Sequence, residues 1–236
     1  MKMRGLLAAV LIALAACSNA EPKPSLISSL EQLASQGNAE ATYHLGMIYW
    51  TGTGATKDPK RAVSYFEHAA AAGDPLASYK MGCIWDGQDG VFQRDPEKAL
   101  RYKLVAANAG YALAQEDVAA LYAERNEIPL ALEWITKAAK QGTSGALESY
   151  ASVYNGAPGV TPDPVKTAAY FRLFLERTDA TDQQKKWLGS FEAKLSPEQR
   201  RQVREMVANY RAAPTPLTIK ALRGIERAEE LAASAK

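Results

Sequence analysis

The sequence predicts an all-α protein built as a solenoid of stacked helical hairpins. Two observations predict this fold: one residue pattern occurs four times along the chain, and each copy holds two segments with helical periodicity. The four copies open at Ala41, Ala77, Ala114 and Ala146. Because each helix has a single apolar face, the units can bury these faces only by stacking, and the array should fold as one body.

The first helix of each unit carries an apolar residue four positions after the opening Ala, then a small residue, then a ring three positions later. In the first unit these are Leu45, Gly46 and Tyr49. Residues three and four positions apart share one side of a helix, so the pattern predicts one buried stripe. The later copies are Met81, Gly82 and Trp85, then Val118, Ala119 and Tyr122, then Tyr150, Ala151 and Tyr154.

The second helix of three units begins at an Asp-Pro pair. An Asp side chain caps free backbone N–H groups, and Pro suits the first turn because it has no N–H to leave unpaired. The pairs are Asp58-Pro59, Asp95-Pro96 and Asp163-Pro164, and Glu127 takes this position in the third unit. In the first three units the second helix is expected to close at Gly73, Gly110 and Gly142.

These units resemble Sel-1-like repeats, which are related to tetratricopeptide repeats. Residues 41–76 and 77–113 carry almost every signature position, including Gly52 and Gly54 between the helices of the first unit. The resemblance implies a right-handed α-solenoid of helix–turn–helix repeats over residues 26–178.

Two units depart from the pattern, and flanking segments extend the array. The unit 114–145 has a shorter loop between its helices, which predicts a tighter turn, and the unit 146–178 replaces an Ala pair by Phe174-Leu175. Residues 26–40 look like a preceding half-repeat.

The C-terminal region is expected to be helical but outside the repeats. Residues 179–213 should form capping helices, one of which begins at Ser196-Pro197 with Gln199 completing a capping box and runs to about Tyr210. Residues 214–236 are predicted to form an amphipathic tail helix. The sequence leaves open whether this helix docks on the solenoid.

The N-terminus predicts secretion and lipid anchoring. Lys2 and Arg4 precede an apolar run that is shorter than the roughly 20 residues of a membrane span, so residues 1–16 are interpreted as a signal peptide. The last residues of this run and Cys17 resemble the lipobox of bacterial lipoproteins, which implies cleavage before Cys17 and acylation of it, with residues 17–25 as a linker. An ordinary signal peptide with a chance Cys is the alternative.

The lipoprotein resemblance also implies a location. Acyl chains would hold the protein on a membrane, with about 0.8 kcal/mol for each buried methylene. Ser18 stands where an Asp would act as a retention signal in lipoproteins of Gram-negative bacteria. We therefore expect a periplasmic protein anchored to the outer membrane.

The charge balance argues against nucleic-acid binding, and the cysteine count argues against an internal disulfide. Without Lys2 and Arg4, the 28 basic residues fall to 26, against 26 acidic residues, so the mature chain is near neutral and gives no support to nucleic-acid binding. With Cys17 acylated, Cys83 has no partner for an internal disulfide.

No enzyme or metal site is expected. His44 and His68 lie in different helices of one unit without the spacing of a zinc motif. The segment 86–90 only faintly resembles a calcium loop, because it lacks the terminal Glu. The sequence also has no Gly-x-Ser-x-Gly motif. No cofactor, metal ligand or catalytic residue is predicted.

The related tetratricopeptide units imply a partner-binding surface, since their first helices line the concave face. Carried over to this chain, that geometry gives partner-binding residues Tyr43, Met47, Trp50, Tyr79, Asp86 and Glu116, and further groove positions Glu40, Cys83, Ala120, Ala123, Glu148, Ser152 and Asn155. Aromatic residues and Met are typical of protein-binding hot spots. An alternative stays open: the patch of Tyr43, Met47 and Trp50 packs under residues 25–36 or against the C-terminal tail.

The function predicted from these features is that of a non-catalytic periplasmic lipoprotein that binds a partner protein as an envelope adaptor or scaffold. An alternative is an immunity protein, because small Sel-1-like lipoproteins resemble those that neutralise antibacterial phospholipase effectors of type VI secretion. A hydrolase, an activity sometimes attached to this repeat family, is a third hypothesis for which the sequence offers no candidate residue.

Overall fold

A computed structural model describes residues 25–88 and 90–234, and within these ranges the protein has twelve α-helices and no β-strand. The all-α solenoid is therefore confirmed. The helices are α1 (Leu26–Ser35), α2 (Ala39–Thr51), α3 (Pro59–Ala71), α4 (Pro75–Trp85), α5 (Pro96–Asn108), α6 (Ala112–Glu124), α7 (Ile128–Gln141), α8 (Ser144–Tyr154), α9 (Pro164–Leu175), α10 (Asp182–Glu192), α11 (Pro197–Asn209) and α12 (Pro216–Ala233). The predicted signal peptide, Cys17 and most of the linker lie outside the described residues.

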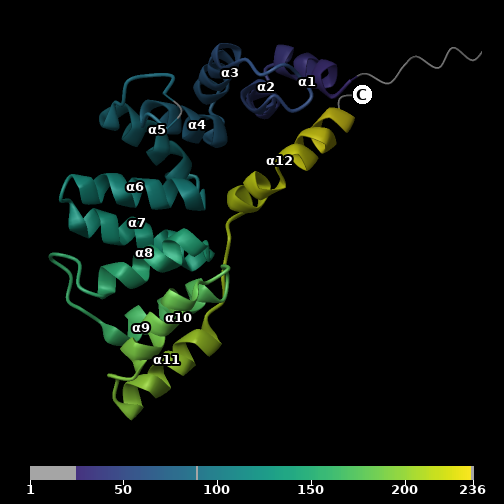
Figure 1. The fold of residues 1–236 in the computed structure, drawn as a ribbon. Coiled ribbons are helices and arrows are strands. Elements are labelled where there is room, and N and C mark those ends of the chain that lie inside the picture. The colour runs from purple at the N-terminus through teal and green to yellow at the C-terminus, as the bar shows by residue number, and fades with distance from the viewer. Residues whose placement is uncertain (1–24, 89, 235–236) are drawn as a thin grey trace, which may run out of the picture.

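Consecutive helices pair as hairpins that stack along the chain. The hairpins are α2 with α3, α4 with α5, α6 with α7 and α8 with α9, and each also packs on the next. Helix α1 packs on α2, as a half-repeat would, and α11 packs on α9 at the other end. The stack bends into an arc (Figure 1).

The Asp-Pro pairs start the second helices as predicted. Asp58, Asp95 and Asp163 each accept a hydrogen bond from the backbone N–H three residues further on. The first helices begin two residues before Ala41 and Ala77, because the side chains of Asn38 and Asp74 cap them there.

The third unit has the tight turn that its short loop predicts. Helix α6 ends at Glu124 and α7 begins at Ile128, so three residues connect them. Asn126 adopts a left-handed backbone with φ of 59° in this turn. Asparagine tolerates that conformation better than most residues, so it replaces the lost glycines.

Small residues in the repeat pattern let paired helices approach closely. A Cβ atom placed on Gly46 would lie 2.5 Å from the ring of Phe66. On Gly82 it would lie 2.5 Å from Lys103 Cγ and 3.2 Å from the backbone oxygen of Ala99. The glycines of the first helices therefore set the distance between the two helices of a hairpin.

The tail docks on the solenoid, which answers the question that the sequence left open. After α11 the chain continues without helix through residues 210–215, and α12 then runs along the open side of the arc back to α1 and α2 (Figure 1). The tail thus connects the middle of the arc, where Thr215 and Thr218 bond to Gln141, with the end formed by α1 and α2. Among the helices of residues 25–234, none has the length and apolar character needed to cross a membrane.

Candidate functional site

Helix α12 covers part of the surface that we predicted to bind a partner. Ala228 and Leu231 of α12 pack in one buried cluster with α1 and α2. We call the receiving residues the tail-binding surface: Leu30 of α1 with Glu40, Ala41, Leu45 and Ile48 of α2. Of the patch Tyr43, Met47 and Trp50, only Tyr43 and Met47 border α12, across a cavity, and none of the three belongs to the buried cluster that holds Ala228 and Leu231.

Glu40 supplies the charged contact of the tail-binding surface. Arg227 donates two hydrogen bonds to it, Nε to Oε1 at 2.8 Å and Nη2 to Oε2 at 3.1 Å, and Lys220 Nζ lies 3.3 Å from Oε1. His44 Nε2 lies 3.8 Å from the same oxygen. His44 and Arg227 together hold the pKa of Glu40 well below its usual range, although burial opposes this. Glu40 is thus an anion that selects basic side chains.

The beginning of α12 is held by a different set of contacts, which we call the polar anchor. The Thr215 hydroxyl donates to the backbone oxygen of Gly110 at 2.7 Å, and the Thr218 hydroxyl donates to Gln141 Oε1 at 2.7 Å. Gln141 Oε1 also accepts from the backbone N–H of Thr215 at 3.0 Å. The N–H of Ala112 at the start of α6 donates to Thr218 at 3.0 Å. Polar groups buried here are paired, so the anchor fixes the tail to α6 and α7.

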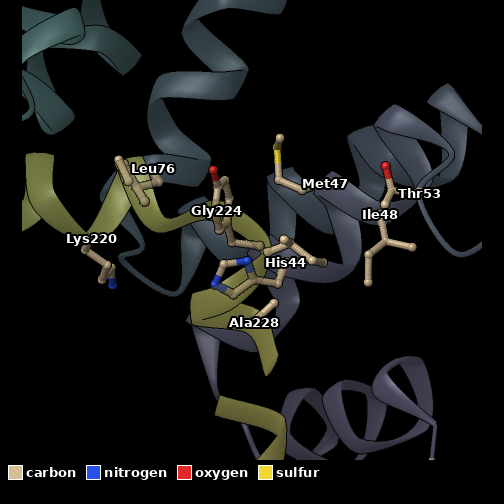
Figure 2. Close-up of a pocket in the computed structure, with 11 residues that line it drawn as sticks. His44, Met47, Ile48, Thr53, Leu76, Lys220, Gly224 and Ala228 are labelled. Carbon is tan, nitrogen blue, oxygen red and sulfur yellow. The ribbon is translucent and has the colours of Figure 1, made fainter. Parts of the chain in front are cut away.

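A cavity of about 150 Å³ remains between α2 and α12 (Figure 2). Tyr43, His44 and Met47 line it from α2, and Lys220 and Gly224 line it from α12. Burial raises the pKa of Tyr43, in keeping with its enclosed position. Gly224 interrupts the helix with φ of 46° and ψ of −113°, so α12 bends where it borders the cavity.

Tyr43, Met47 and Trp50 are brought together as the sequence pattern implied. All three pack against the cluster that contains Phe66. The centroid of the Phe66 ring lies 6.1 Å from that of Tyr43 and 6.0 Å from that of Trp50. Lys80 Nζ lies 5.2 Å from the centroid of the Trp50 ring. Their role in binding a partner stays a prediction.

Tyr79, Asp86 and Glu116 lie further along the arc, and each has an intramolecular partner. The Tyr79 ring packs edge-on against Tyr111 at 4.9 Å. Glu116 accepts a hydrogen bond from the hydroxyl of Thr143, and burial raises its pKa. Partner binding by these residues also stays a prediction.

Asp86 belongs to a buried ion-pair group that sequence analysis missed. Lys103 Nζ lies 2.6 Å from Asp86 Oδ2 and 2.8 Å from Asp117 Oδ2, and the Lys103 side chain is 1% exposed. Arg94 Nε donates to Asp86 Oδ1 at 2.9 Å. Burial disfavours the charge on Asp86, but these hydrogen bonds outweigh it and lower the pKa. Nearby Cys83 is a buried free thiol whose pKa burial raises.

A second groove lies where the tail does not reach. Glu148 and Ser152 of α8 and the adjoining Asn155 line it with Phe171 of α9 and Trp187 of α10, around a volume of about 340 Å³. We call it the open groove, since none of the described residues of α12 lines it. Its α8 residues are the fourth-unit positions that the tetratricopeptide geometry assigned to the groove.

Trp187 is the residue of the open groove that sequence analysis did not find. Its ring packs edge-on against Phe171 at 4.6 Å and stacks on Phe191 at 5.2 Å, yet the residue is 39% exposed. It lies in α10, after the last repeat, so the repeat pattern gives it no position. Large exposed aromatic residues are the signal that identifies it.

The described part of the chain contains no group of three or more His, Cys, Asp or Glu side chains arranged to hold a metal ion.

Comparisons with known proteins identify the repeat. The profile of the Sel1 repeat matches residues 39–74, 75–111, 112–143 and 146–179. The chitin synthase regulator SKT5 of Saccharomyces cerevisiae is 31% identical over 137 residues, which cover 55% of this chain but only 19% of the yeast protein. This chain therefore spans about a fifth of that relative's length.

Two solved structures have the same kind of fold. A Sel1 repeat protein from Oxalobacter formigenes superposes with a TM-score of 0.61 at 23% identity, over 86% of this chain and 78% of the other. A protective antigen of uropathogenic Escherichia coli superposes with a TM-score of 0.50 at 21% identity, over 82% of this chain and 50% of the antigen.

Proposed function

The chain belongs to the Sel1 repeat family, and from this we propose that it is a non-catalytic adaptor that binds a partner protein on the inner side of its arc. Sel1 repeats generally mediate protein–protein interaction. One observation carries the proposal most directly: the arc already holds a helix, α12, by apolar packing and by ion pairs with Glu40. Protein interfaces use the same combination of an apolar centre and charged surroundings.

The open groove is a surface that the tail leaves available to a partner, and we assign it to the inner side of the arc on the tetratricopeptide geometry. Trp187 offers an exposed aromatic face supported by Phe171 beneath it. Tryptophan is among the residues that contribute most to binding energy in interfaces. Ser152 and Asn155 add polar groups at the edge of this face. We assign the partner contact to this combination.

Similarity to a regulator is in keeping with such a role. The yeast relative is named as a regulator of chitin synthase, and its match covers 55% of this chain. A protein that regulates another protein by binding alone needs a binding surface and no catalytic residues of its own.

The proposal is tested by replacing Trp187. The protein is immobilised, exposed to envelope extract of its own organism, and the retained proteins are quantified by mass spectrometry. We expect Trp187→Ala to lower retention of the partner at least about tenfold, as loss of an aromatic hot spot does. Glu148→Lys changes the same groove without touching the aromatic packing and should also lower retention.

Leu130→Ala is the matched control, because Leu130 is 38% exposed but lies on α7 outside the groove. Equal retention by Trp187→Ala, Glu148→Lys and Leu130→Ala would contradict the proposal. Trp50→Ala, measured beside them, tests the patch that the repeat pattern indicated. An envelope-assembly protein as the partner would assign the scaffold role, and a secreted toxin would assign the immunity role.

We also propose that the protein is anchored in the periplasm through a lipid on Cys17. The support is the order of charged, apolar and small residues before this cysteine. Replacing Cys17 by Ala should move the protein from the membrane fraction to the soluble fraction and abolish labelling by radioactive palmitate. Unchanged membrane association of Cys17→Ala would contradict the anchor and leave the adaptor proposal standing.

A further inference from the structure

We propose that residues 225–233 of α12 are an exchangeable occupant of the tail-binding surface, and that a partner protein presents a basic amphipathic helix that replaces them. This inference rests on the proposed protein-binding function and gives the partner a chemistry. It concerns a different surface from the open groove, so each can be tested without the other.

The two halves of α12 are held in different ways. The first half is fixed through the polar anchor, in which the hydrogen bond of Thr218 with Gln141 is buried and that of Thr215 with Gly110 is partly buried. The second half is held by Ala228 and Leu231 and by the ion pair of Arg227 with Glu40. Between them Leu222 is 81% exposed. The second half can therefore leave its surface while the anchor stays in place.

Gly224 provides the hinge between these halves. Its φ of 46° is in the left-handed region, which glycine adopts freely and other residues adopt with strain. A Cβ atom on Gly224 would meet no atom within 4 Å, so backbone conformation alone restricts this position. The tail must bend here because its first half is fixed to α6 and α7, whereas a separate helix is free of that constraint.

The tail fills its surface incompletely. The cavity of about 150 Å³ borders Gly224, where α12 has no side chain. His44, whose side chain is only 8% exposed, also lines this region, and its Nε2 lies 3.8 Å from Glu40 Oε1, beyond hydrogen-bond distance. A cavity of this size accommodates a group as large as benzene. A straight helix with a large apolar residue at this position would fill the space that the tail leaves empty.

Charge complementarity defines the rest of the partner helix. Glu40 is paired with two basic residues of the tail, Lys220 and Arg227. Arg227 directly precedes the small residue Ala228 and lies four positions before Leu231. A competing helix therefore needs a basic residue followed by a small residue, with a Leu on the same face one turn later.

The experiment uses a fluorescent peptide of residues 219–234 that carries Gly224→Leu, and measures its binding to the protein by anisotropy. The proteins compared are the unaltered chain, Gly224→Ala and Gly189→Ala. Gly189 is the matched control, because it lies inside helix α10 and a Cβ atom there meets no atom within 4 Å. We expect Gly224→Ala to bind the peptide roughly tenfold more tightly than the other two proteins. The positive φ at position 224 is strained for Ala, so this substitution favours release of residues 225–233 from the tail-binding surface.

A second peptide and a second protein variant separate the outcomes. A peptide that also carries Arg227→Glu should bind at least about tenfold more weakly, because it faces Glu40 with like charge. In the protein, Arg227→Ala should raise affinity for the first peptide without altering the backbone at Gly224. Circular dichroism confirms that each variant is helical.

Two results would overturn the inference: no binding of the first peptide to either opened variant, or equal binding of the two peptides. If neither peptide binds as expected while Trp187→Ala still lowers partner retention, only the proposed exchange of the tail is wrong. If the peptides behave as expected while retention is independent of the open groove, the assignment of that groove is wrong.

Discussion

Lys103 is buried between two carboxylates, Asp86 and Asp117, where α4, α5 and α6 meet. Removing one partner of a buried ion pair leaves an uncompensated charge and costs about 3–5 kcal/mol. We therefore predict that Lys103→Ala lowers the free energy of unfolding by about that amount in urea titrations. The exposed pair of Lys137 with Glu133 provides the control, since Lys137→Ala should cost less than about 1 kcal/mol. Equal effects of the two substitutions would contradict the structural role of Lys103.

Glu40 makes the tail sensitive to acid. Its pKa in the folded protein is below the ordinary value of 4.5, so its ion pairs stabilise the tail above that pH and are lost as the pH falls further. We predict that hydrogen-exchange protection of residues 225–233, corrected for intrinsic rates, decreases between about pH 5 and pH 3. In Glu40→Gln, hydrogen-exchange protection of these residues should be low at both pH values. The same pH dependence in Glu40→Gln would show that another group is responsible.

Among the elements, the hairpin of α4 and α5 depends on the absence of a side chain at Gly82. An added Cβ would lie 3.2 Å from the backbone oxygen of Ala99, which cannot move without separating the helices. Overpacking of this kind costs roughly 1–3 kcal/mol, so we predict a lower melting temperature for Gly82→Ala. Gly189→Ala should keep or raise the melting temperature, because that site is open and Ala favours helix. A Gly82→Ala variant as stable as Gly189→Ala would contradict close packing of this hairpin.

Elements with local signals were predictable from sequence. Asp58 and Pro59 fix a helix start through contacts within a few residues, and Ser196 with Gln199 does the same for α11. Helices α2 and α4 begin two residues before the Ala that opens each repeat, because the pattern marks the buried Ala and not the capping residue.

Features that depend on distant residues were not predictable. Arg227 and Glu40 are 187 positions apart, and nothing in either local sequence indicates that they meet. Lys103 stands where the repeat register has Phe66 in the first unit and Ile135 in the third, so its burial follows the pattern. Only the arrangement of α4, α5 and α6 shows that Asp86 and Asp117 pair with it. Trp187 follows the last repeat and has no counterpart in the repeat pattern.

At the scale of the whole molecule, the polar anchor connects the tail to the middle of the arc. Gln141 bonds to both Thr215 and Thr218, and its amide nitrogen donates to the backbone oxygen of Gly110 at 2.9 Å. Gln141→Leu leaves these buried groups unpaired, which costs roughly 1–3 kcal/mol for each. We predict that limited proteolysis then cuts within residues 210–234 while the repeats stay intact. Unchanged resistance of the tail would show that the anchor does not hold it.

The central claim is that the inner side of the arc binds a partner protein, and site-specific photo-crosslinking in living cells tests it most directly. A benzophenone amino acid replaces Ser152 in the open groove or, as control, Leu130 on α7, in otherwise unaltered protein. We predict that light attaches one defined protein at position 152 and not at position 130. Crosslinks to that protein at position 130 alone, or none at position 152, would contradict the claim.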